Sequence, residues 1–249
     1  MDVGAEFSKP GTGTVDSTWV FNQQGLLSQA GGALWLNAGG TSSGSYTNLH
    51  GTLGLGGGTH AWSGAMHAAG SGKVNLTGGQ LQLNGSLALD GVRLEQSGGE
   101  FNGTGTGGTL TMANGARYVW SGGSRYGTTI LANGCVTEIA GTGEKLFGDG
   151  AVLRNYGEII WTGGPIKGWC YQSGATLRNY AGARFVCDGG TGLTRQYSQA
   201  AHFTVDAGAE FTKPGTGTVN STWVFNQQGL LSQAGGALWL NAGGTSSGS

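Results

Sequence analysis

The stretch EIIWTGG, residues 158–164, holds the pattern that decides the fold. Apolar residues stand at alternate positions, Ile159 and Trp161, and a glycine pair follows. A period of two predicts a β-strand with one buried face, and the glycines predict a turn because they adopt backbone angles that other residues avoid. Versions of this tile recur, and the first glycines of their turns are Gly57, Gly78, Gly98, Gly122, Gly141, Gly163, Gly189 and Gly215. Successive turns are therefore 19 to 26 residues apart.

A second strand signal precedes the tile, as in VLRNYGEIIW at 152–161 and TLRNYAGARFV at 176–186. In both stretches an apolar run leads into an asparagine, and the tile follows a few residues later. Strand, asparagine corner, strand and glycine corner make one coil. Coils of this length without a helical period predict an all-β protein, a right-handed parallel β-solenoid with roughly 20–26 residues per coil.

Alignment of the tiles on their glycines predicts two rows of stacked side chains. The apolar row consists of Tyr118, Thr137, Ile159, Phe185 and Phe211, and the neighbouring row consists of Arg117, Val136, Glu158, Arg184 and Glu210. A solenoid needs such rows, because like residues stack along its axis and charges alternate in sign. A β-sandwich or barrel is the competing fold, since short strands with Asn-Gly turns are typical of it as well.

Composition excludes several other classes of protein. Glycine fills 54 of 249 positions, but only three prolines and no Gly-X-Y period are present, which excludes collagen. Regularly spaced aromatic residues and a net charge of −1 argue against disorder. The sparse, scattered charges offer no basic stripe to nucleic acid, and no apolar run is long enough for a membrane span or a signal peptide.

One segment occurs twice. Residues 4–45 return as residues 208–249 with two differences, Ser8/Thr212 and Asp16/Asn220. Near-identity over such a length is typical of a tandem array. We therefore expect a single continuous solenoid over 1–249, in which 4–207 form one unit and 208–249 begin the next, cut from a longer protein.

The two copies should share one backbone, displaced along the axis by about nine strand spacings. Identical side chains should then face the same way, so that Trp19 matches Trp223 and Trp35 matches Trp239. The two ends should also be complementary, so that concentrated protein stacks head to tail.

Two long stretches resemble a known class of protein. The run from ALWLNAGG to LALDG, residues 33–91, and VLRNYGEIIWTGG, residues 152–164, are similar to the glycine-rich β-strand repeats of large secreted or surface-anchored bacterial proteins. These include autotransporter passenger regions and stalks of filamentous-haemagglutinin-type adhesins. The resemblance covers nearly the whole chain and implies a long β-helical stalk that projects other parts from the cell.

Cysteines and histidines offer little chemistry. The spacing of Cys135, Cys170 and Cys187 matches no zinc signature. Cys187 aligns with Trp120 in the inward row, which indicates a buried apolar residue, and a Cys170–Cys187 bridge is the alternative. No His-Glu-x-x-His motif is present, so we expect solvated loop histidines at His50, His60, His67 and His202.

An enzyme is the main alternative function, because parallel β-helices also host polysaccharide lyases and glycosidases, whose carboxylates converge in a groove. The candidate groups lie in neighbouring tiles: Glu138, Glu158, Asp188 and Glu210, with Arg154 and Arg178. Tyr156 and Tyr180 form either a carbohydrate-stacking platform or a corner pair that packs on itself. GDGAVL at 148–153 is a single copy, whereas a calcium roll needs tandem copies.

The sequence favours a structural repeat module of an extracellular or cell-surface stalk, fibre or adhesin, without catalytic, cofactor or metal sites. Its expected partners are neighbouring units of the same chain or head-to-tail copies of itself, with cell-surface glycans as a further candidate. We expect no nucleic-acid partner and no membrane span. The alternative is a polysaccharide-binding protein or a polysaccharide lyase or hydrolase.

Overall fold

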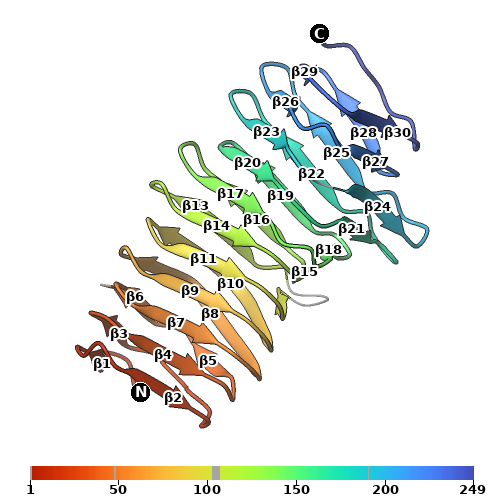
Figure 1. The fold of residues 1–249 in the computed structure, drawn as a ribbon. Coiled ribbons are helices and arrows are strands. Elements are labelled where there is room, and N and C mark those ends of the chain that lie inside the picture. Colours follow the sequence, from red (N-terminus) through yellow and green to blue (C-terminus); the bar gives the residue numbers. More distant parts are fainter. Residues whose placement is uncertain (1, 48, 103–106, 190) are drawn as a thin grey trace.

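The computed structural model describes residues 2–47, 49–102, 107–189 and 191–249. The strands coil about one axis in about 11 turns of about 21 residues, with the N-terminal strands at one end and the C-terminal strands at the other (Figure 1). Neighbouring coils are joined by parallel ladders. The predicted parallel β-solenoid is confirmed, and the antiparallel pairing of an up-and-down barrel or sandwich is not what these strands form.

Each coil has three faces, which we number in chain order. Face 1 stacks β1 (Glu6–Lys9), β3 (Leu26–Gln29), β6 (Ser45–Thr47), the second halves of β8 (Thr59–Ala69) and β10 (Gln80–Asp90), β13 (Thr109–Ala113), β16 (Thr128–Leu131), β19 (Val152–Asn155), β22 (Thr176–Asn179), β25 (His202–Val205) and β28 (Val224–Gln227).

Face 2 is an 11-stranded sheet of its own. It stacks β2 (Thr14–Ser17), β4 (Ala33–Leu36), β7 (Thr52–Leu55), β9 (Lys73–Leu76), β11 (Arg93–Gln96), β14 (Arg117–Trp120), β17 (Val136–Ile139), β20 (Glu158–Trp161), β23 (Arg184–Cys187), β26 (Glu210–Lys213) and β29 (Leu230–Gln233).

Face 3 joins face 1 in a 19-stranded sheet, because β8 and β10 run through the corner between the two faces. It stacks β5 (Gly40–Ser42), the first halves of β8 and β10, β12 (Glu100–Phe101), β15 (Gly123–Arg125), β18 (Lys145–Phe147), β21 (Ile166–Trp169), β24 (Gly192–Gln196), β27 (Thr218–Ser221) and β30 (Ala237–Leu240).

Both rows that the sequence predicts are present on face 2. The ladder pairs Tyr118, Thr137, Ile159, Phe185 and Phe211 in succession. All five side chains are buried, whereas the row that begins at Arg117 faces outward. Every second residue of these strands points into the core. The alternation of apolar and polar residues in the sequence therefore identifies the buried side chains.

Glycines occupy the corner between faces 2 and 3 because the corners stack on each other. Gly79 has a φ of +64°, and a Cβ on it would collide with the carbonyl oxygen of Gly58 in the coil below. That carbonyl belongs to a glycine corner of the same kind. A row of small residues along this corner is therefore a packing requirement, since backbone lies where a side chain would be.

Asparagines close the corner between faces 1 and 2. Asn155 and Asn179 are buried register partners, and the Asn155 side-chain amide donates to the Asn179 side-chain oxygen at 2.6 Å. Asn155 also accepts the Gly157 amide at 3.0 Å, and Asn179 donates to the carbonyl of Glu210 at 2.9 Å. The asparagine corner in the sequence is thus a ladder of side-chain amides that satisfies buried backbone groups.

The two near-identical segments have the same local structure. Glu6 pairs with Leu26 as Glu210 pairs with Leu230, and the next strand also keeps its register, Thr14 with Ala33 as Thr218 with Ala237. Lys9 donates to the carbonyls of Gly11 and Gly31, and Lys213 donates likewise to those of Gly215 and Gly235. The chain is a tandem repeat at the level of its hydrogen bonds.

The expectation that identical side chains face the same way was wrong. β1 lies on face 1, but its copy β26 lies on face 2, and β2 lies on face 2 while its copy β27 lies on face 3. Ten strands of face 1 run from β1 to β25, which makes nine full turns, and β26 follows one face later. The interval of 204 residues is therefore nine turns and one face, so the second copy is rotated about the axis.

Candidate functional site

Face 2 carries the charged ladder. The Arg184 guanidinium lies 3.1 Å from the Glu158 carboxylate and 3.5 Å from that of Glu210. Arg117 lies 2.6 Å from Glu138 in the same sheet. These side chains are all partly exposed, so each pair contributes at most about 1 kcal/mol.

The candidate catalytic carboxylates do not converge on an unoccupied groove. Glu138, Glu158 and Glu210 each contact an arginine, and these contacts run along the sheet as the charge ladder does. Asp188 is exposed at the end of β23. A shallow hollow of about 250 Å³ beside Glu158 and Arg184 holds no second acid among its lining residues.

The twin LRNY segments lie directly above one another. Tyr156 and Tyr180 stack with ring centroids 4.3 Å apart, and the Arg178 guanidinium lies 4.8 Å from the Tyr180 ring. Arg178 also bonds Asp206 at 2.9 Å. The tyrosines therefore pack on each other at the corner. The ring faces that contact each other in this stack are not free to stack on a sugar.

The histidine prediction was wrong for three residues, since His202 is the half-buried first residue of β25. His60 and His67 lie within β8, an 11-residue strand, and not in loops. His60 is buried, its ring nitrogen lies 3.0 Å from the Gly57 carbonyl, and burial lowers its pKa. His67 faces outward, 3.6 Å from Asp90. Glycine and alanine around these histidines obscured the strand, although His60, Trp62, Met66 and Ala68 are its inward residues.

Cysteines lie in the core. Cys135, Cys170 and Cys187 are buried thiols, and the alternative Cys170–Cys187 bridge is not formed. Burial raises the pKa of Cys135 and of Cys170, which disfavours the reactive thiolate. Among the described residues no three histidine, cysteine or acidic side chains gather closely enough to hold a metal ion.

The Asp149 carboxylate in GDGAVL has a structural role. It accepts the backbone amides of Gln172 at 2.8 Å and Ser173 at 3.1 Å. Both amides belong to the turn of the next coil. Asp149 therefore ties two successive turns together.

Inward cations serve the glycine corners. The Lys145 ammonium is buried and donates to the carbonyls of Gly141 and Gly163, both at 2.9 Å. The Trp161 indole N–H donates to Gly163 and Gly164 at the same corner. The sequence analysis missed this role. Its signal is a lysine, glutamine or tryptophan at an inward position next to a glycine turn.

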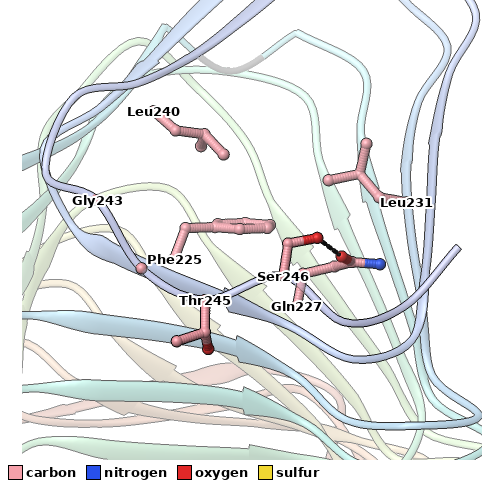
Figure 2. Close-up of a pocket in the computed structure, with 8 residues that line it drawn as sticks. Phe225, Gln227, Leu231, Leu240, Gly243, Thr245 and Ser246 are labelled. Atoms are coloured by element: carbon pink, nitrogen blue, oxygen red, sulfur yellow. Dashed lines mark hydrogen bonds between the residues drawn. The ribbon is translucent and has the colours of Figure 1, made fainter.

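An open hollow lies at the C-terminal end (Figure 2). Its volume is about 250 Å³, and the labelled lining residues Phe225, Leu231 and Leu240 surround a Gln227–Ser246 hydrogen bond. The equivalent bond in the first copy joins Gln23 and Ser42. This hollow is therefore the interior of the last coil.

The first copy shows what fills this interior. Tyr46 pairs in register with Leu27, its hydroxyl bonds Ser42 at 3.1 Å, and its ring stacks on Trp62 at 4.9 Å. Leu27 is buried there, whereas its copy Leu231 is only partly buried. In the first copy a further coil therefore covers the residues that are equivalent to the lining of this hollow.

Comparisons with known proteins found no match to a family model, a curated protein or a solved structure. Within the described ranges, no helix is long and apolar enough to cross a membrane.

Proposed function

We propose that this chain is a structural repeat module of an extracellular or cell-surface stalk, fibre or adhesin, without catalytic activity. The observation that carries the proposal is the local identity of the two copies, which lie in one uninterrupted solenoid. Glu6–Leu26 and Glu210–Leu230 have the same register at opposite ends of the molecule. A chain in which the opening coils recur can add units without changing its architecture.

The distribution of chemistry supports a scaffold. The glutamates of face 2 neutralise arginines, Asp149 fastens a turn, and buried lysines and asparagines satisfy corner carbonyls and amides. Each of these polar groups has a partner that maintains the coil. Bacterial surface stalks of the class that the sequence resembles use such coils as rigid spacers, which is why we place this module outside the cell.

Two experiments test this function. Antibodies against the purified chain should label intact cells of the source organism without permeabilisation, and labelling only after permeabilisation would contradict the location. In the second, the protein should not cleave pectin, alginate or other acidic glycans. Saturable cleavage that Glu158→Gln or Asp188→Asn abolishes would favour the polysaccharide lyase or hydrolase instead.

A further inference from the structure

Two tryptophans in identical sequence have opposite environments. Trp19 is 83% exposed in the first coil, whereas Trp223 is 0% exposed in the second copy. The Trp223 indole N–H donates to the carbonyl of Thr194 at 2.7 Å, and its ring makes an edge contact with Phe147 at 5.8 Å. Coils of the preceding unit therefore cover Trp223.

The phenylalanines of the second copy complete this interface. Phe211 stacks on Phe185 at 5.5 Å, and Phe225 stacks on Phe203 at 5.1 Å. Backbone ladders support both contacts, since the Glu210 amide donates to the Ala183 carbonyl and the Val224 amide donates to the Ala201 carbonyl, both at 2.9 Å. The coil formed by β23, β24 and β25, residues 184–205, thus presents an upper edge that binds the opening of a unit.

The first copy has the same aromatic arrangement at its exposed edge. Phe7 and Phe21 meet edge to face at 5.7 Å and 83°, as Phe211 and Phe225 do at 5.5 Å and 86°. We call β1, β2 and residues 20–23 the N-terminal edge, which lies at one end of the solenoid (Figure 1). Its aromatic geometry is already in place without the covering coil, and such preorganisation lowers the cost of binding.

The C-terminal end does not fit this edge. Its last strands, β29 and β30, are copies of β3 and β4, which the first copy pairs with β6 and β7. The C-terminal end is therefore shaped to pair with residues 45–55. Residues 26–36 of the same chain already pair with them. The repeat thus argues against complementarity of the two bare ends, because residues 208–227 cover the surface that fits the N-terminal edge.

We infer that the N-terminal edge is a docking surface for the 184–205 coil of a second copy of this unit, and that the docked copy is turned by one face. This inference rests on the proposed function as a repeat module. Within one chain, β26 pairs with β23 on face 2. In the complex, β1 of the docked chain pairs with β23 of the other chain in the same way. Face 1 of the docked chain therefore continues face 2 of the other chain. Three units in succession return to the starting face.

The test uses full-length chains with matched substitutions in the two copies. Phe211→Asp with Trp223→Asp should release the second copy from the 184–205 coil, and Phe7→Asp with Trp19→Asp should disable the N-terminal edge. A chain with all four changes offers only a free 184–205 coil, and we call it the acceptor. The unmodified chain offers only a free N-terminal edge, and we call it the donor. Sedimentation of their mixture should show a one-to-one complex, which is absent when the donor carries Phe7→Asp and Trp19→Asp.

Cross-linking tests the rotation. Glu6→Cys in the donor should form a disulfide with Arg184→Cys in the acceptor, because Arg184 pairs with the equivalent Glu210. It should not form one with His202→Cys, the first residue of β25, which docking without rotation would place opposite Glu6. The opposite preference would overturn the rotation.

Absence of a complex with an acceptor that keeps its β-sheet circular dichroism would overturn the docking. If that acceptor does not fold, a second acceptor carries Trp223→Ala and Trp19→Ala instead of the four aspartate substitutions. Absence of a complex with this second acceptor would also overturn the docking. Failure of docking leaves the surface-labelling result unchanged, so the two proposals are tested separately.

Discussion

Phe185 and Phe211 stack on successive coils of face 2, with ring centroids 5.5 Å apart and an angle of 8° between the rings. Both side chains are buried, and they belong to the inward row that begins at Tyr118. Arg184 precedes Phe185 and points outward between two glutamates. Adjacent residues of one strand thus have opposite surroundings.

Substitutions at these two positions should differ sharply. Phe185→Asp should lower the free energy of unfolding by about 4 kcal/mol or more, because an unpaired carboxylate replaces a buried ring. Arg184→Ser should cost less than about 1 kcal/mol, since its ion pairs are exposed to solvent. Urea unfolding followed by circular dichroism measures both, and equal losses would refute the inward and outward assignment.

Two glycines separate the effect of stacking from that of backbone strain. Gly79 and Gly115 both have positive φ, +64° and +75°, but an added Cβ meets backbone only at Gly79. Gly115→Ala should cost about 1 kcal/mol, the usual cost for alanine at positive φ. Gly79→Ala should cost about 1–3 kcal/mol more because the coil below must move. A similar midpoint of thermal unfolding for the two variants would show that the corners are not tightly stacked.

The free energy of unfolding should depend on pH between about 8 and 10.5 because of Lys145. Burial lowers its pKa from 10.5 to about 8 in the folded protein. Between these two values the unfolded chain binds more protons than the folded chain, so the free energy of unfolding should rise from pH 8 to pH 10.5. Lys145→Gln keeps a donor for the corner carbonyls but does not titrate. Its stability should rise less over this range, and unchanged pH dependence would contradict the assignment.

The sequence predicted the strand faces well, because residues of the tile alternate and each tile ends at a glycine corner. The row from Tyr118 to Phe211 follows from these two facts alone, with every register pair in the predicted place.

The number of faces between the two copies could not be counted in this way. Gly31 and Gly32 turn the chain from face 1 to face 2, but Gly57 and Gly58 turn it from face 2 to face 3. The glycine pattern looks the same at both corners, so the extra face between them left no signal. In β8 the chain rounds a corner within one strand, with Gly64 at φ +78°, and that corner lacks the glycine pair.

The candidate chemistry was predicted less completely, for a physical reason. The Glu158–Arg184–Glu210 ladder follows from register, which the tile provides. Buried roles such as that of Lys145 depend on which carbonyls turn inward at a corner. Side-chain periodicity does not reveal the direction of a backbone carbonyl.

A crystal structure of the chain tests the central claim, that the repeated segment returns one face later, most directly. Superposition of residues 4–45 on residues 208–249 should require a rotation by one face together with a rise of about 45 Å, which is nine and one-third strand spacings. Glu210 should then lie beside Arg184 on face 2, while Glu6 lies on face 1. A superposition by translation alone, with β1 and β26 on the same face, would contradict the account.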